Sequence, residues 1–193
     1  MSLVERTFVV GEGENLYGVR FQNESYENAN EHEYTKYIRL WDDPDYLVDI
    51  FEKHRSKLQS GFFKDSSCED FLFQTERDAA NLFSRVYRAA SAPTTEALRR
   101  LFKRLDNTDE ATNPQNYPLL KVKGPEEKSW LRLYGLRTKD DLYIITGGAI
   151  KLTHKMKEDD HLQLQLERMK SVRKYLSRLY REDRHAEFFS LTA

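Results

Sequence analysis

Polar and basic side chains gather at the end of the most strand-like stretch of this chain. The segment 130–157 reads WLRLYGLRTKDDLYIITGGAIKLTHKMK, in which two apolar runs flank a polar turn. Its end carries Lys151, Thr153, His154, Lys155 and Lys157. The apolar part can build a sheet, and the basic part is then left over at the exit of that sheet. A basic cluster with a histidine in such a place is the kind of surface that can hold and cut RNA.

The other motifs that could carry chemistry are weak. Gly11-Glu12-Gly13 is not a phosphate-binding loop, because no lysine or third glycine follows in register. The five histidines show no zinc-ligand spacing, so we predict no metal site and no cofactor. The sequence contains no nucleophile elbow of a serine hydrolase. The carboxylate pairs Asp42-Asp43 and Asp140-Asp141 are better explained as a helix cap and a turn.

Length and composition indicate one rather polar, soluble domain over residues 1–193. The 193 residues suffice to bury a core, and 39% of them are hydrophobic against 33% charged. The apolar runs are short, such as 142–145, and the start MSLVERTFVV lacks the features of a signal peptide. Cys68 is the only cysteine, which excludes an internal disulfide and a cysteine metal cluster. We therefore expect a cytoplasmic protein that has no membrane partner.

The net charge of −1 conceals an asymmetry between the two halves of the chain. Residues 1–96 hold 11 Lys and Arg against 18 Asp and Glu, a balance of −7. Residues 97–193 hold 20 Lys and Arg against 14 Asp and Glu, a balance of +6. A basic half can attract phosphate backbones. The simpler interpretation is that both halves are solvated faces that attract one another within one fold.

Residues 1–41 are expected to form a β-hairpin followed by an acidic loop. Residues 7–10 (TFVV) and 16–21 (LYGVRF) are rich in strand formers and flank a connector with two glycines. The stretch 22–35 (QNESYENANEHEYT) is polar and acidic, which is typical of a loop. The apolar residues between Tyr37 and Trp41 then return the chain to the core.

Residues 42–105 are expected to be helical. Three helices are predicted, over about 42–58, 67–91 and 95–105. Their starts are marked by the acidic pair before Pro44 and by the hydroxyl groups of Ser67 and Thr95, which can cap a first turn. Residues 106–116 (DNTDEATNPQN) are expected to be a loop.

From residue 117 to residue 182 the pattern indicates an antiparallel sheet and a final helix. Three strands with period two are predicted, over Tyr117–Val122, Trp130–Arg137 and Leu142–Leu152. Gly147-Gly148 interrupts the last strand, which indicates a bulge or a close backbone approach. Apolar residues spaced by three and four from Leu162 to Leu179 form one face of a helix, which should pack on the sheet. The predicted fold class is therefore α+β.

Several motifs within residues 98–180 resemble those of a known family. Tyr117–Lys121 (YPLLK) matches a family strand of the form L-Y-E-L-R, and Trp130–Tyr134 (WLRLY) matches one like Y-R-V-L-Y. Ile145–Lys155 (ITGGAIKLTHK) matches L-L-H-G-F-x-K-K-T-x-K, with glycine, lysine, threonine and lysine in register. Together with the order hairpin, helices, meander, basic turn and helix, this resembles the RelE-like toxins, and it is closest to the HigB-like, phage-related branch of type II toxin–antitoxin systems. The resemblance implies a RelE-like fold with an additional N-terminal region.

The resemblance also implies an activity. Such toxins are typically ribosome-dependent mRNA endonucleases, in which the 2′-hydroxyl of the RNA is the nucleophile and no metal is needed. The protein must supply a group that takes this proton, cations for the charged phosphorane, and a group that protonates the leaving oxygen. The implied partners are mRNA, the ribosome and a cognate antitoxin protein.

The resemblance places candidate roles on individual residues. His154 would act as acid or base because its side chain titrates near neutral pH, and Lys151 and Lys155 would hold and neutralise phosphate. Arg132 could make a bidentate phosphate contact, and Tyr134, two residues on, shares its face and could stack on a base or transfer a proton. Supporting RNA contacts are assigned to Lys121, Arg137 and Lys157, and His161 is a weaker catalytic candidate.

Each assignment has a simpler alternative. A lone surface histidine is often merely solvated, Tyr134 could be a core aromatic, and Arg132 could form an internal salt bridge. The competing function is a non-catalytic module of the same fold that binds a protein or a nucleic acid. A third hypothesis makes residues 22–35 an acidic cover over the basic groove, and it demands a contact of that segment with Lys151 or Lys155.

Overall fold

The computed structural model describes residues 4–59, 66–105, 117–125, 129–153 and 159–190. Within these ranges the centre is one mixed sheet of six strands in the order β1-β2-β6-β5-β4-β3. The strands are β1 (Val4–Val9), β2 (Leu16–Phe21), β3 (Lys103–Arg104), β4 (Leu119–Lys123), β5 (Leu131–Arg137) and β6 (Tyr143–Ile150). The helices are α1 (Glu33–Leu40), α2 (Pro44–Leu58), α3 (Cys68–Ala90), α4 (Glu96–Leu101), α5 (Asp160–Arg181) and α6 (His185–Phe189). The predicted α+β class and the hairpin of β1 and β2 are confirmed.

Two of the predicted helix starts are confirmed by their caps. The carboxylate of Asp43 precedes α2 and accepts hydrogen bonds from the backbone N–H groups of Asp45 at 3.0 Å and Tyr46 at 3.3 Å. The hydroxyl of Ser67 precedes α3 and accepts from the N–H of Asp70 at 3.1 Å, while the Asp70 carboxylate accepts from the N–H of Ser67 at 3.3 Å. These bonds satisfy amide groups that the first turn of a helix leaves without partners.

The structure corrects the sequence prediction at two helices. The sequence predicts a loop over 22–35, but α1 begins at Glu33, because a helix places Tyr34, Tyr37 and Trp41 on one face that the core buries. The third predicted helix, expected to reach residue 105, ends at Leu101 as α4. The residues that follow leave the helix because they pair with β4 as the short edge strand β3.

The predicted meander is present, and β6 lies in the interior of the sheet. β4 pairs antiparallel with β5, and β5 pairs antiparallel with β6. On its other side β6 pairs in parallel with β2, through Leu16–Gly18 and Tyr143–Ile145. Beyond these residues β2 continues to Phe21 and β6 continues to Ile150 without pairing with each other. We call this divergence of β2 and β6 the fork.

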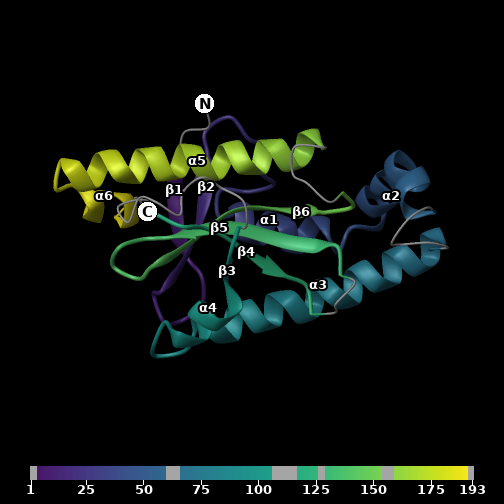
Figure 1. The fold of residues 1–193 in the computed structure, drawn as a ribbon, viewed down its shortest axis with the longest axis horizontal. Coiled ribbons are helices and arrows are strands. Elements are labelled where there is room, and N and C mark those ends of the chain that lie inside the picture. The colour runs from purple at the N-terminus through teal and green to yellow at the C-terminus, as the bar shows by residue number, and fades with distance from the viewer. Residues whose placement is uncertain (1–3, 60–65, 106–116, 126–128, 154–158, 191–193) are drawn as a thin grey trace.

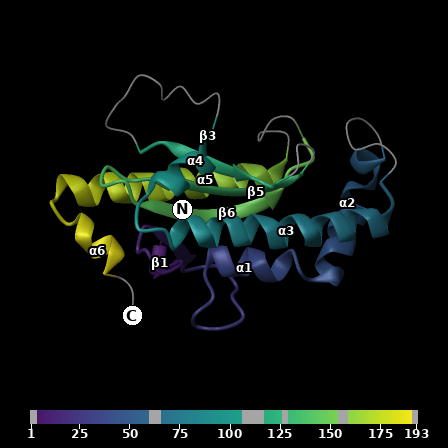
Figure 2. The ribbon, with the colours of Figure 1, turned by 90° about the horizontal axis from the view of Figure 1, so that it is seen from below.

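Helices cover both faces of the sheet (Figure 1). The apolar side of α5 packs on one face, as its spacing predicts, and the core on the other face is completed by α1, α2, α3 and α4. Figure 2 shows α1 alongside α3, with which it is in contact. The short α6 docks on β1, where the hydroxyl of Thr7 donates to the carbonyl oxygen of Phe188 at 3.0 Å. Within the described ranges, no helix is long and apolar enough to cross a lipid bilayer.

The Gly147-Gly148 pair is both a bulge and a place of close approach, as predicted. The pairing of β5 with β6 shifts by one residue beside Tyr134. A Cβ atom on Gly147 would lie 1.9 Å from Oε1 of Gln165 on α5, and one on Gly148 would lie 2.9 Å from the ring of Tyr37 on α1. Gly147 also has a φ of +156°. The two glycines therefore allow α5 and α1 to approach β6 closely.

Gly147→Ala should lower the free energy of unfolding by about 1–3 kcal/mol, because the added methyl group overlaps Gln165 and strains the backbone. Urea denaturation followed by circular dichroism measures this loss. In a Gln165→Ala background the same glycine substitution should cost less, because the overlapping amide is gone. An equal cost in both backgrounds would contradict the steric explanation.

Candidate functional site

The predicted catalytic residues belong to the end of the meander, and part of the set lies outside the described residues. That part consists of His154, Lys155 and Lys157. Lys151 is described: it follows β6, is partly exposed, and its backbone N–H donates to the carbonyl oxygen of Trp130 at 2.8 Å. After residues 154–158, the next described residue is Asp159, the N-cap of α5. The described surroundings of the predicted site are therefore the end of β6, the start of β5 and the first turn of α5.

The strand register places several predicted residues on one face of the sheet. Lys121 on β4 pairs with Tyr134 on β5, and Lys123 pairs with Arg132. Residues that pair across neighbouring strands project to the same face. Tyr134 identifies that face as the one α5 covers, because it belongs to the core under this helix. Lys121, Lys123 and Arg132, which we call the meander cations, thus lie together on adjacent strands.

Arg137 lies apart from the meander cations. It is near the other end of β5 and, by strand alternation, on the opposite face from Tyr134. Its guanidinium group is 3.4 Å from the carboxylate of Asp141, which also pairs with Arg99 of α4 at 2.6 Å and accepts a hydrogen bond from the hydroxyl of Thr95. These contacts link the turn between β5 and β6 to α4.

The backbone holds the guanidinium group of Arg132 in a set orientation. Its Nη1 donates to the carbonyl oxygens of Ser129 at 2.7 Å and Leu131 at 2.6 Å. Burial lowers the pKa of Arg132, but an arginine stays charged at physiological pH. Nε and Nη2 form no hydrogen bond with any residue in the described ranges. The edge of the guanidinium group that carries Nε and Nη2 is therefore left for an external anion.

Tyr134 lies beneath this surface rather than on it. Its side chain is 1% exposed and packs in the core under α5. Burial raises the pKa of its hydroxyl group, while the charge of Arg132 lowers it and that of Asp159 raises it. The phenol therefore keeps its proton at neutral pH, and in this conformation its ring is packed against protein.

A titratable cluster lies at the start of α5, and its member Asp159 interacts electrostatically with Tyr134, which shares a face with the meander cations. Asp159 caps α5 by accepting a hydrogen bond from the N–H of His161 at 3.0 Å, and Lys57 of α2 lies 3.8 Å from its other oxygen. Electrostatic interactions link His54 of α2 to both Asp159 and His161. Burial lowers the pKa of both histidines, so both are mainly neutral near pH 7.

Sequence reasoning missed most of this cluster. His54 and Lys57 carry no local signal of a site, because they meet Asp159 only through the packing of α2 near the start of α5. Only Asp159 carried a local signal, because an aspartate just before the apolar pattern of the last helix is a typical N-cap residue. In the part of the chain that the structure describes, no three His, Cys, Asp or Glu side chains are placed to hold a metal ion.

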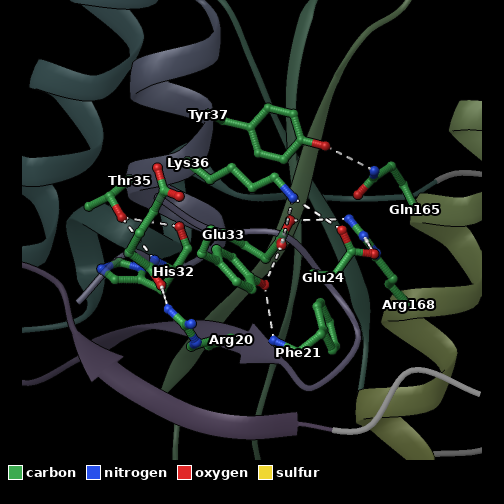
Figure 3. A network of polar contacts seen from close by, with 12 residues as sticks. Arg20, Phe21, Glu24, His32, Glu33, Thr35, Lys36, Tyr37, Gln165 and Arg168 are labelled. Carbon is green, nitrogen blue, oxygen red and sulfur yellow. Dashed lines mark hydrogen bonds and ion pairs between the residues drawn. The ribbon is translucent and has the colours of Figure 1, made fainter. Parts of the chain in front are cut away.

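Buried charges close the fork between β2 and β6 (Figure 3). The carboxylate of Glu33 on α1 lies 3.2 Å from the guanidinium group of Arg168 on α5, and both residues are at most 2% exposed. Glu24, from the loop after β2, also pairs with Arg168, and the ammonium group of Lys36 is 3.1 Å from Glu24 and 4.0 Å from Glu33. Burial raises the pKa of Glu33, and the attraction of Arg168 and Lys36 opposes this shift.

Neutral hydrogen bonds complete this network. The hydroxyl of Tyr26 accepts from the N–H of Phe21 at the end of β2 at 3.0 Å and donates to Glu33 at 2.8 Å. The amide of Gln165 on α5 donates to the hydroxyl of Tyr37 on α1 at 3.1 Å. Diverging parallel strands often leave a ligand crevice at their carboxyl ends. Here side chains of the protein itself occupy that place, so we assign the network a structural role.

These pairings bear on the charge asymmetry of the sequence. Glu24 and Glu33 come from the acidic half and pair with Arg168 from the basic half, as the simpler interpretation predicts. Glu31 pairs with Arg39 of α1 at 2.8 Å. The acidic segment is thus engaged with α1 and α5. The contact with Lys155 that the cover hypothesis allows lies outside the described residues.

A fully buried histidine, His32, lies at the N-cap of α1. It is 5% exposed, and its ring stacks on Phe8 with 4.9 Å between the ring centroids. Gly18 of β2 leaves room for it, since a Cβ atom there would lie 2.0 Å from Nδ1. Burial lowers the pKa of His32 to about 4, against the attraction of Glu31. His32 is therefore neutral at pH 7.

Comparisons with known proteins add no relative from which a role could be transferred. No protein-family model, no curated protein and no solved structure matches the chain.

Arg168→Leu should lower the free energy of unfolding by about 3–5 kcal/mol, because it leaves the buried carboxylate of Glu33 without its main counter-charge. Adding Glu33→Gln should restore part of the loss. The matched control is Lys170→Leu on the same helix, where a half-exposed pair with Glu167 should contribute at most about 1 kcal/mol. Equal losses for Arg168→Leu and the control, measured by urea denaturation, would refute the structural role of the network.

His32 should make the protein less stable in acid. Its folded-state pKa of about 4 lies below the unfolded value of about 6.5, so the unfolded chain binds the proton first as the pH falls. The contribution of His32 is fully present above about pH 6.5 and declines by about 3 kcal/mol as the pH falls to about 4. His32→Phe should flatten the measured dependence of unfolding free energy on pH in this window. A dependence unchanged by His32→Phe would contradict this assignment.

Proposed function

We propose that the chain is a RelE-like endoribonuclease that cleaves mRNA without a metal, in association with the ribosome, at the end of the meander. The observation that carries the proposal is the placement of Lys121, Lys123 and Arg132 on one face of adjacent strands. Tyr134 on that face interacts electrostatically with Asp159, the N-cap of α5. The order of elements on which the family resemblance rests, from hairpin to C-terminal helix, also supports it. A cognate antitoxin would be the natural protein partner of such an enzyme.

The proposed reaction is an internal transfer within the RNA. The 2′-oxygen attacks the adjacent phosphorus, the bond from phosphorus to the 5′-oxygen breaks, and a 2′,3′-cyclic phosphate and a 5′-hydroxyl are formed. One proton leaves the 2′-oxygen and one arrives at the 5′-oxygen, so no co-reactant is consumed. The protein must therefore supply positive charge around the phosphorane and a pair of proton-transfer groups.

The residues at the end of the meander can divide these tasks. Nε and Nη2 of Arg132 offer a bidentate contact to a phosphate, and Lys121 and Lys151 add positive charge. His154, assigned through the resemblance, and His161, which the structure places at the start of α5, are the candidates for proton transfer. His161 is neutral because burial lowers its pKa, and a neutral imidazole can accept the proton of the 2′-hydroxyl.

Cleavage should leave a 2′,3′-cyclic phosphate and should depend on the meander. Purified protein is incubated with mRNA, with and without ribosomes, and the RNA ends are mapped and tested for a cyclic phosphate. The triple variant Lys151→Ala, His154→Ala, Lys155→Ala should lose about 10²-fold or more in rate, the usual scale of a lost acid–base group. Arg132→Lys keeps the positive charge but removes the bidentate guanidinium group, and it should lower the cleavage rate about tenfold.

The matched control is Lys174→Gln with Arg181→Gln, which removes two exposed cations from the C-terminal half of α5 and should cleave as wild type does. Circular dichroism establishes that each variant is folded. Expression in a bacterial host should arrest growth for the wild type and for the control, and not for the triple variant. Fragments that lack a 2′,3′-cyclic phosphate, or intact RNA with a folded wild-type protein, would refute the proposal.

The second candidate is a non-catalytic module of the same fold that binds RNA or a protein. Two observations favour it: the ring of Tyr134 is packed in the core, and one nitrogen of Arg132 is engaged by the backbone. This alternative predicts that the protein binds RNA through the meander cations and leaves it uncut. The cleavage and end-mapping experiment separates the two candidates directly.

A further inference from the structure

A basic groove between α3 and α4 lies apart from the site described above. It is a hollow of about 420 Å³ lined by Arg85, Arg88 and Arg100 together with Ala89, Ala97 and Leu101. The first two arginines stand on the C-terminal part of α3, and the third stands on α4, which packs against α3. We call this hollow the arginine groove. Neither the family resemblance nor the proposed catalytic chemistry uses it.

The positive charge of the arginine groove is largely uncompensated. Residues 79–105 contain six Lys and Arg and a single acidic residue, Glu96. Glu96 pairs with Arg100 at 3.1 Å. Arg88 donates to a neutral serine hydroxyl at 2.9 Å, and Arg85 forms no ion pair with any residue of the described ranges. Two of the three guanidinium groups thus have no carboxylate partner within the described ranges, and clustered cations raise the local concentration of anions.

The edge strand β3 connects the arginine groove to the meander cations. Lys103 pairs with Lys121 and therefore projects to the face of the meander cations, whereas Arg104 pairs with Leu120 and projects to the face that α3 and α4 cover. Both side chains are exposed. In Figure 1, α4 and β3 lie side by side at this edge of the sheet. The edge thus carries one cation toward each face.

A simpler role exists for the charges on β3 but not for those in the groove. Lysine and arginine on an edge strand discourage pairing with other chains, which suffices for Lys103 and Arg104. It does not explain three arginines from two helices around one hollow. The floor of that hollow is formed by small and aliphatic side chains, which leave the guanidinium groups as its polar features.

We propose that the arginine groove is a second RNA-contact surface, which binds phosphates of a single strand that continues from the meander around β3. This inference rests on the proposed function and extends it, since the groove would hold RNA beyond the cleaved bond. Arginine suits this role because its planar fork binds phosphate bidentately. An acidic protein would be the other polyanion, but the lining lacks the aromatic anchors typical of protein interfaces.

Binding of uncleavable RNA tests the inference separately from catalysis. Fluorescence anisotropy is measured with 2′-O-methyl RNA strands of about 6 and about 20 nucleotides. The short strand has only enough phosphates for one small site, whereas the long strand can occupy the meander and the arginine groove together. Arg85→Gln, Arg88→Gln, Arg100→Gln should weaken binding of the long strand by about tenfold and lower its salt slope by about 2, because three phosphate contacts are lost. Binding of the short strand should change no more than in the control variant Lys174→Gln, Arg178→Gln, Arg181→Gln, which loses the same charge from the C-terminal half of α5.

Each outcome decides the inference. Selective loss of long-strand affinity in the groove variant supports it, and equal losses in the groove and control variants overturn it, since net charge would then suffice. Polyglutamate that competes as well as RNA of equal charge would overturn the assignment of RNA as the occupant. Should wild type bind but never cleave RNA, the proposed catalysis fails while the length dependence still decides the groove. Should wild type cleave and the groove variant bind the long strand unchanged, the groove alone fails.

Discussion

The fold depends on how the fork between β2 and β6 is closed. These two parallel strands pair only through Leu16–Gly18 and Tyr143–Ile145, so the rest of each strand borders a gap. The gap is filled by the ion pair of Glu33 and Arg168, which joins a helix from the N-terminal half to the C-terminal helix. A buried ion pair of this kind is better tolerated when further partners surround both groups. Tyr26 donates a hydrogen bond to Glu33, Lys36 adds a positive charge near Glu33, and Glu24 pairs with Arg168, whose Nε has no hydrogen-bond partner among the described residues.

The closure of the fork also determines where the candidate site forms. Arg168 and Gln165 bind α5 to α1, and the bulge at Gly147 gives α5 the room to approach β6. The first turn of α5 is thereby held at the end of the meander, where Asp159 and His161 adjoin the face that carries Arg132. The same packing buries Tyr134. The position of α5 therefore decides which of the polar residues on this face are accessible and which are core.

The electrostatics of the molecule follow from this arrangement. Acidic side chains of the N-terminal half form ion pairs with Arg39, Lys36 and Arg168, inside or close to the fork. Within the described ranges Arg132 and Arg85 form no ion pair, and Arg100 pairs with Glu96. The asymmetry seen in the sequence therefore has two parts. One part is neutralised internally across the fork, and the other remains as basic surface on both sides of the β3 edge.

Much of the local structure was predictable from the sequence. The caps at Asp43 and Ser67, the period-two strands of the meander and the apolar spacing of α5 each act within a few residues, so residue type and order were sufficient. The same alternation correctly predicts that Arg132 and Tyr134 share a face. The helix α1 was missed because its polar surroundings conceal a short apolar face that only the sheet reveals.

Other features were decided by tertiary structure alone. Nothing local indicates that β2 pairs with β6, that Glu33 meets Arg168, or that His54 lies near His161, because each pair joins residues far apart in the chain. Tyr134 is buried only because α5 packs over it. The hollow at Arg85 likewise exists only because α4 packs beside α3. The sequence by itself determined the elements and the chemistry available on each. Only packing determined which charges are neutralised in the interior and which remain at the surface, because desolvation depends on neighbours that the sequence order does not specify.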